Sequence, residues 1–79
     1  MIVVRAESFD KKFNKIKDNT AKIKVSKQIQ KIIENPNIGK PMRYARKGTR
    51  EVYISLFRLS YKYENNVLTF LDLYHKDEQ

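Results

Sequence analysis

The sequence contains no cysteine, one histidine, two glycines and two prolines in 79 residues. Without cysteine it is neither a small disulfide-bonded secreted domain nor a cysteine-ligated zinc protein. One histidine leaves too few ligands for a zinc site built from protein alone. No apolar run approaches the about 20 residues that cross a bilayer, and Arg5 and Glu7 directly follow the first apolar residues, unlike a signal peptide. These absences predict a soluble, cytoplasmic protein without a metal or cofactor.

The composition is that of one small globular domain. Hydrophobic residues make up 41% and charged residues 33% of the chain, which excludes disordered and fibrous proteins. A chain this short buries only about 60% of the surface that its unfolded form exposes. We therefore predict a single domain over residues 1–79 that gains stability from a partner.

The positive charge is concentrated in two segments, which outweigh the net acidic remainder of the chain and give the net charge of +8. Residues 11–31 hold eight lysines and one acid, and residues 40–50 hold five bases and no acid. Such segments attract phosphate groups or an acidic partner. A solvated lysine face on a helix explains the first segment equally well. The second is rich in arginine, whose guanidinium group suits phosphate better than an ammonium group does.

The N-terminal half predicts a strand over residues 1–5 and then an antiparallel helical hairpin. Ser8 is the expected N-cap of the first helix, and residues 18–20 (Asp-Asn-Thr) break the chain and cap a second helix. The second helix is expected to end at residues 35–37 (Asn-Pro-Asn). The apolar residues recur at helical spacing, namely Phe9, Phe13 and Ile16, and then Ala21, Val25, Ile29, Ile32 and Ile33. This apolar seam needs a sheet to pack against.

The C-terminal half predicts antiparallel strands. Their expected ranges are 42–46 and 50–54, followed by a bend at 55–56 and a hairpin of 57–63 with 67–75. Asn65 and Asn66 tolerate left-handed backbone and supply a two-residue turn. The predicted fold class is α+β, with an N-terminal strand and a helical hairpin packed on one face of a four-stranded, mostly antiparallel sheet.

The turn predicts which residues face each other in the hairpin. The expected pairs are Tyr63 with Leu68, Tyr61 with Phe70, Leu59 with Asp72, and Phe57 with Tyr74. Arg58 then faces Leu73, and His75 is its diagonal neighbour, about 7–8 Å away. The single histidine and a strand arginine are thus expected on the face that the helices leave open, with Tyr74 beside them at the strand end.

A histidine and an arginine on an open, basic face suit chemistry on a phosphodiester. Imidazole exchanges protons near neutral pH, and guanidinium stabilises extra negative charge on a phosphate in a transition state. Without a metal, such chemistry suits RNA, whose own 2′-hydroxyl is the nucleophile. The alternative is that His75 is a bystander. Glu51, Glu64 and Asp72 are interpreted as surface or structural charges.

The order of elements and four short motifs resemble the RelE/ParE toxin superfamily of bacterial and archaeal toxin–antitoxin modules. The resemblance covers almost the whole chain. Its more specific pieces are Gly39-Lys40-Pro41-Met42-Arg43-Tyr44, Lys47-Gly48-Thr49-Arg50-Glu51-Val52-Tyr53, Phe57-Arg58-Leu59-Ser60-Tyr61 and Leu73-Tyr74-His75-Lys76.

The resemblance to RelE-like members implies a metal-independent endoribonuclease. Such toxins enter the ribosomal A site and cut translated mRNA with the 2′-hydroxyl of the substrate, which inhibits translation. Arg58 matches an arginine that holds the scissile phosphate, His75 matches a general acid or base, and Tyr74 falls where other members place a catalytic or stacking tyrosine. The positions implied to bind RNA are Arg43, Arg46, Lys47, Arg50 and Lys76.

The resemblance also implies partners, namely mRNA, the ribosome and an antitoxin whose acidic, helical segment wraps around the toxin. ParE-like relatives share the fold, lack ribonuclease activity and act on DNA gyrase, so a non-enzymatic gyrase inhibitor is one alternative. A basic nucleic-acid-binding domain, dominated by the lysines of residues 11–31, is another. Arg58 and His75 on one face would favour the nuclease.

Overall fold

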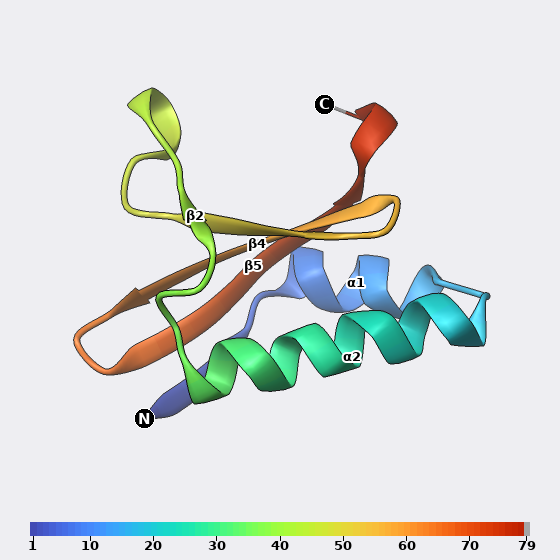
Figure 1. The fold of residues 1–79 in the computed structure, drawn as a ribbon, viewed down its shortest axis with the longest axis horizontal. Coiled ribbons are helices and arrows are strands. Elements are labelled where there is room, and N and C mark those ends of the chain that lie inside the picture. Colours follow the sequence, from blue (N-terminus) through green and yellow to red (C-terminus); the bar gives the residue numbers. More distant parts are fainter. Residues whose placement is uncertain (79) are drawn as a thin grey trace.

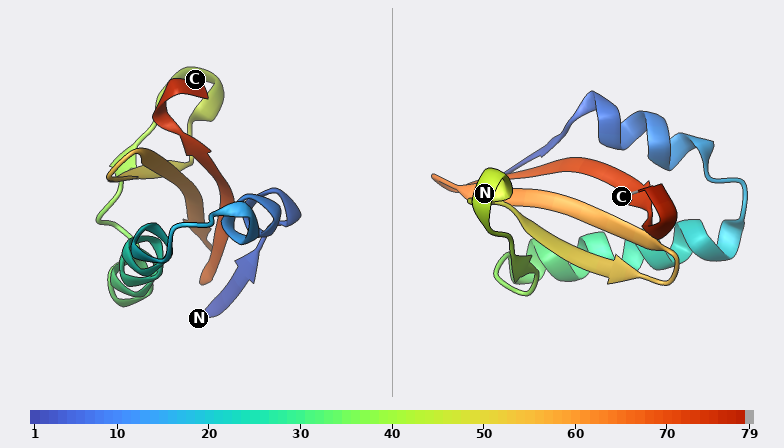
Figure 2. Two further views of the ribbon diagram at one scale, coloured as in Figure 1. Left: turned by 90° about the vertical axis from the view of Figure 1, so that its right-hand side faces the viewer. Right: turned by 90° about the horizontal axis from the view of Figure 1, so that it is seen from above.

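In the computed structural model, which describes residues 1–78, two helices pack on one face of a five-stranded sheet (Figures 1 and 2). The elements in chain order are β1 (Ile2–Arg5), α1 (Glu7–Lys15), α2 (Asn19–Glu34), β2 (Lys40–Pro41), the 3-10 helix η1 (Tyr44–Arg46), β3 (Arg50–Ile54), β4 (Phe57–Glu64), β5 (Val67–His75) and the 3-10 helix η2 (Lys76–Glu78). The predicted α+β class and helical hairpin are confirmed, but the sheet has five strands and not four. No helix in residues 1–78 has the length and apolar character needed to span a bilayer.

The sheet has the strand order β1-β5-β4-β3-β2. β1 pairs with β5 in parallel, Ile2 beside Val67 and Arg5 beside Phe70, and the other neighbours are antiparallel. The N–H of Ala6 donates to the carbonyl of Phe70 at 2.9 Å and extends this pairing into the start of α1. The last long strand of the sequence therefore lies inside the sheet, between the first strand and β4.

The two helices start by different means. Asp18 caps α2 and accepts a hydrogen bond from the N–H of Thr20 at 2.9 Å, which confirms the predicted break. The predicted N-cap of the first helix is wrong, because α1 begins at Glu7 and its N-cap is Ala6, which makes no side-chain cap bond. Ser8 lies in the first turn instead, and its hydroxyl donates to Oδ1 of Asp72 at 2.9 Å.

The core lies between the helices and the sheet. Its buried apolar residues are Phe9, Val25, Ile32, Val52, Ile54, Leu59, Tyr61, Leu68, Phe70 and Leu73. Tyr61 is fully buried, and its hydroxyl donates to the carbonyl of Pro36 at 2.8 Å and accepts from the N–H of Gly39 at 2.9 Å. A Cβ at Gly39 would lie 2.6 Å from that hydroxyl oxygen, so only glycine lets the backbone approach this closely. These contacts fix the end of α2 against the sheet.

The segment between β2 and β3 is a compact turn, and the strand predicted over residues 42–46 is wrong. Successive turn hydrogen bonds join Arg46 N to Arg43 O at 3.3 Å, Lys47 N to Tyr44 O at 3.0 Å, and Thr49 N to Arg46 O at 3.0 Å. The hydroxyl of Thr49 also donates to Arg46 O at 2.7 Å. These local bonds occupy backbone groups that a strand would need, and the segment rises away from the sheet (Figure 1).

The β4–β5 hairpin has the predicted two-residue turn but not the predicted register throughout. Asn65 and Asn66 have φ of 54° and 62°, and Tyr61 and Tyr63 pair with Phe70 and Leu68 as predicted. A bulge then shifts the register by one residue, so that Ser60 pairs with Asp72. Because neighbouring strand residues point to opposite faces, the bulge exchanges the faces of Leu73, Tyr74 and His75, whereas Asp72 still contacts α1.

Candidate functional site

The bulge decides which residues share the face of the sheet that the helices leave uncovered, here called the open face. Arg58 pairs with Tyr74, and Phe57 pairs with His75. Since directly paired residues point to the same face, Arg58 and Tyr74 share the open face and His75 does not. The prediction that Arg58 and His75 point the same way is therefore wrong. Leu73, expected on the open face, is 1% exposed and lies in the core.

Arg58 lies between two tyrosines in a row that crosses three strands. It pairs with Tyr53 of β3 on one side and with Tyr74 of β5 on the other. The guanidinium carbon of Arg58 lies 4.4 Å from the centre of the Tyr53 ring, a cation–π contact that orients the group. A cation held on an aromatic ring can bind a phosphate while the ring contacts a base.

Glu51 is the buried acid of the open face and joins two segments above it. It is 3% exposed, and its Oε2 accepts the hydroxyl of Tyr74 at 2.5 Å and Nη1 of Arg46 at 3.1 Å. The same Nη1 donates to the Tyr74 hydroxyl oxygen at 3.2 Å. Arg46 belongs to the turn before β3 and Tyr74 to the end of β5, so their side chains reach toward each other across the face.

This cluster of Arg46, Glu51 and Tyr74 keeps the tyrosine protonated. Burial raises the pKa of the Tyr74 phenol, the hydrogen bond to Glu51 raises it further, and Arg46 opposes both effects. The hydrogen bond to Tyr74 is the largest cause that raises the pKa of Arg46, whose positive charge offsets the carboxylate of Glu51. The open face thus presents a phenolic proton donor beside a carboxylate, within reach of the Arg58 position on the neighbouring strand.

The five residues predicted to bind RNA are not all on this face. Arg43 and Lys47 are exposed on the turn segment 42–49, which rises on the side away from the helices (Figure 1). Lys76 is exposed at the start of η2, directly after β5. Arg50 pairs with the buried Tyr61, and its Nη1 donates to the carbonyls of Asn37 at 3.2 Å and Gly39 at 2.8 Å. Arg50 thus faces the helix side and holds the loop after α2.

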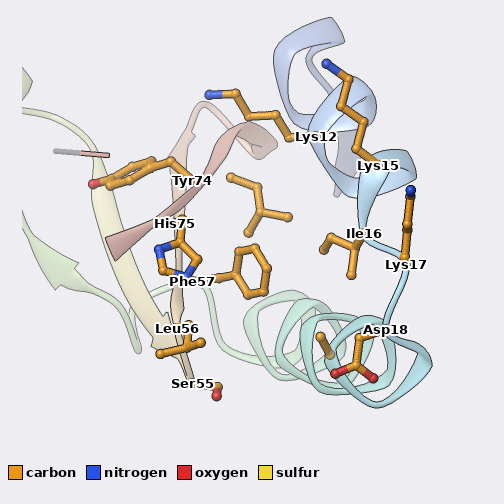
Figure 3. A pocket seen from close by; sticks show the side chains of 12 residues that line it. Lys12, Lys15, Ile16, Lys17, Asp18, Ser55, Leu56, Phe57, Tyr74 and His75 are labelled. Carbon is orange, nitrogen blue, oxygen red and sulfur yellow. The ribbon is translucent and has the colours of Figure 1, made fainter. Parts of the chain in front are cut away.

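His75 lies on the helix side, at the edge of a pocket. Its ring stands edge-on to Phe57, with ring centres 5.8 Å apart and an interplanar angle of 77°. Figure 3 shows His75 turned toward Phe57 and the Tyr74 ring pointing away from the pocket. Nδ1 accepts the N–H of Asp77 at 3.3 Å, so the neighbouring backbone helps to fix the imidazole. The two adjacent residues at the strand end therefore serve opposite sides of the sheet.

Sequence reasoning missed Glu51, although a signal for it was present. In residues 50–54, Val52 and Ile54 alternate toward the core, so the same period places Glu51 and Tyr53 on the opposite face, with Arg58. An acid in the middle of a basic, aromatic face marks a candidate proton acceptor. Within residues 1–78, no group of three or more His, Asp or Glu side chains could hold a metal ion.

One family model matches this chain. It is described as the ParE toxin of the type II toxin–antitoxin system parDE, and it matches residues 3–79. No curated protein matches the sequence. The family match covers nearly every residue that builds the sheet and the helices.

Several solved toxin structures have the same fold. The intact RelBE toxin–antitoxin complex of E. coli matches with a TM-score of 0.79 at 15% identity, covering 94% of each chain. The RelBE2 toxin–antitoxin complex of Mycobacterium tuberculosis matches with a TM-score of 0.78 at 19% identity, over 94% of this chain and 95% of that one. The YoeB dimer of Staphylococcus aureus matches with a TM-score of 0.77 at 18% identity, over 95% and 97%. At these identities the likeness concerns the fold.

Proposed function

The chain belongs to the ParE toxin family of type II toxin–antitoxin systems, within the RelE/ParE superfamily, and on this premise we propose that it is a ribosome-dependent endoribonuclease. Its substrate is translated mRNA, cut in the ribosomal A site without a metal ion. The observation that carries the proposal is the row of Tyr53, Arg58 and Tyr74 across the open face. A guanidinium held on the Tyr53 ring, with Tyr74 on the next strand, suits one phosphate of an unpaired strand with its bases stacked alongside.

The proposed reaction uses the 2′-hydroxyl of the RNA as nucleophile. The 2′-oxygen attacks the neighbouring phosphorus, the bond from phosphorus to the 5′-oxygen breaks, and a 2′,3′-cyclic phosphate remains. Arg58 contacts the phosphate oxygens, where negative charge grows. Glu51 accepts the proton of the 2′-hydroxyl and Tyr74 gives its proton to the 5′-oxygen. The hydrogen bond between Tyr74 and Glu51 then returns a proton to the phenol.

So sparse a site depends on the ribosome for orientation. Holding the 2′-oxygen, phosphorus and leaving oxygen in line supplies much of the rate enhancement in such a reaction. Arg43, Lys47 and Lys76, exposed around the open face, are proposed to contact the backbones of mRNA and ribosomal RNA. The protein would act in the cytoplasm, where messages are translated.

An antitoxin is the proposed protein partner. The net charge of +8 favours an acidic segment, and an amphipathic helix of that segment would cover the basic helices while its extension blocks the open face. Masking Arg58 and Tyr74 would suppress cleavage because both groups must touch the substrate.

A second candidate is inhibition of DNA gyrase without catalysis. Two observations favour it, namely the match to the ParE family and the Glu51 carboxylate in the middle of the open face, where it repels phosphate. In this case the open face would be a protein-binding surface, and messages would remain intact.

The test is brief induction of the toxin in cells followed by mapping of transcript ends. We expect new ends within translated codons, and at least about a hundredfold fewer of them with Arg58→Ala. Arg5→Ala is the matched control, since Arg5 also lies over aromatic rings but on the edge strand β1. Intact transcripts together with DNA breaks would contradict the nuclease function and support inhibition of DNA gyrase. Equal cleavage by the Arg58 variant, if folded, would contradict the role of the arginine.

A further inference from the structure

A cavity of about 600 Å³ lies on the helix side of the sheet, away from the open face. It is open to solvent and is lined by the end of α1, the connection to α2, the β3–β4 turn and the end of β5 (Figure 3). Its size falls within the range of pockets that bind small molecules or single residues of a polymer. Of the open-face cluster of Arg46, Glu51 and Tyr74, only Tyr74 also lines this pocket.

The floor of this pocket is apolar and partly aromatic. It is formed by Ile16, Leu56, Phe57 and Leu73, with the ring of His75 at the edge. Phe57 and His75 stand edge to face, with ring centres 5.8 Å apart, and the His75 side chain is 33% exposed. A flat nitrogenous base can stack on or insert beside such rings, and imidazole also offers a hydrogen bond to the edge of a base.

The opposite rim is basic. Lys12, Lys15 and Lys17 line it and come from α1 and the turn that follows (Figure 3). Lys12 is paired with Asp72 at 3.0 Å. The carboxylate of Asp18, which also lines the rim, caps α2. Within the described part of the chain, Lys15 and Lys17 make no ion pair, which leaves two ammonium groups to face an anion.

Two consecutive residues at the end of β5 belong to the two sites. Tyr74 points toward Arg58 and Glu51, and His75 points into the pocket. An RNA strand that passes over the end of β5 would contact the open face with one nucleotide and the helix-side pocket with the next. An extended nucleotide unit spans about 6–7 Å, about the length of two strand residues.

We propose that this pocket binds a nucleotide next to the scissile phosphate, with its base against Phe57 and His75 and its phosphate on Lys15 and Lys17. The proposal rests on the proposed ribonuclease function and adds a second subsite to it. His75 is then a substrate-binding residue rather than the partner of Arg58 in catalysis. The base bound here would contribute to the choice of cleavage site, because the open face alone offers stacking surfaces that accept any base.

The test is an NMR titration of the free protein with adenosine 5′-monophosphate, a probe that carries both a base and a phosphate. We expect shifts of the Ile16, Phe57 and His75 signals and a Kd at least about threefold weaker for Lys17→Glu. Lys24→Glu is the matched control, because it makes the same charge change on an exposed face of α2 outside the pocket. A second variant, Leu56→Glu, alters the exposed apolar wall and should also weaken binding.

Three outcomes would overturn the proposal. Ribose 5-phosphate binding as tightly as the nucleotide would mean that no base is recognised. Equal weakening by Lys24→Glu would mean general attraction between charges. Binding of an acidic peptide but not the nucleotide would assign the pocket to a protein partner. Because the titration needs no ribosome, transcript cleavage without nucleotide binding refutes the pocket alone, and binding without cleavage refutes the nuclease function alone.

Discussion

Arg58 of β4 and Tyr74 of β5 are directly paired, and both side chains lie on the face of the sheet that the helices leave uncovered. Tyr74 also donates its hydroxyl to the buried carboxylate of Glu51. This arrangement separates the guanidinium from the single histidine, which lies on the other side of the same strand end. The proposed proton transfers are therefore assigned to a phenol and a carboxylate.

The first prediction compares Tyr74 and His75, the two neighbouring residues at the end of β5, in their effect on the rate of mRNA cleavage. Tyr74→Phe should lower the rate of mRNA cleavage on ribosomes by about a hundredfold, because it removes only the proton donor. His75→Ala should lower it less than about tenfold, since this side chain contacts substrate only through the helix-side pocket. Single-turnover cleavage of a message on programmed ribosomes measures both rates. A larger loss with His75→Ala would contradict the assignment.

The second prediction concerns Glu51. Glu51→Gln keeps the shape of the side chain and its contacts in the cluster but removes the proton acceptor, so cleavage should fall by about a hundredfold. Urea unfolding should show that the variant is folded, because an amide oxygen still accepts from Tyr74 and Arg46. Faster cleavage by this variant would mean that Glu51 only repels the substrate, and it would remove the carboxylate from the mechanism.

The third prediction compares two tyrosine hydroxyls in stability. Tyr61→Phe should lower the free energy of unfolding by about 1–3 kcal/mol, because it leaves the buried N–H of Gly39 and the carbonyl of Pro36 without their partner. Tyr63→Phe is the control, since its hydroxyl donates to the exposed side chain of Asn66 at 3.3 Å, and it should cost less than about 0.5 kcal/mol. Equal costs in chemical denaturation would contradict the anchoring role of Tyr61.

The fourth prediction concerns acid stability. Burial by itself would raise the pKa of Asp72, but hydrogen bonds from Lys12, Ser8 and the N–H of Leu73 outweigh it and lower the pKa. The native carboxylate thus releases its proton at lower pH than the unfolded one, so its stabilisation is present above the unfolded pKa of about 3.9 and is lost as pH falls through the native value. The side chain is 37% exposed, and solvent limits the effect to less than about 1 kcal/mol.

Urea unfolding at pH 7 and near pH 3 measures this contribution of Asp72. The unmodified protein should lose more stability on acidification than Asp72→Asn does. The same loss in both proteins would show that the contacts with Lys12 and Ser8 do not depend on the ionised carboxylate.

Local patterns predicted the helices and most strands because each signal is decided by nearby residues. The apolar spacing of Val25 and Ile32 identified the buried side of α2, and Asn65 and Asn66 identified the hairpin turn. The turn at Tyr44–Arg46 was missed because its tyrosine and arginine are compatible with a strand. There the backbone is held by turn hydrogen bonds that no short sequence pattern identified.

The bulge in β5 could not be predicted from these residues, and the candidate site depended on it. Residues 70–73 (Phe-Leu-Asp-Leu) carry no glycine or other mark of an irregular strand. Contacts distant in sequence favour the shift, because it buries Leu73 in the core and leaves Asp72 in contact with Ser8 and Lys12 of α1. A register error of one residue was enough to exchange Tyr74 and His75 between the two faces.

The position of β5 inside the sheet also determines when the proposed site can form during synthesis of the chain. β5 supplies the pairing surface for both β1 and β4, so a nascent chain that has not yet released residues 67–75 from the exit tunnel lacks the middle of its sheet. Until then Arg58 has Tyr53 beside it but lacks Tyr74, and the apolar residues of the helices lack the middle of the sheet that they pack against. The proposed cleavage site therefore cannot assemble on the growing chain before residues 67–75 have emerged.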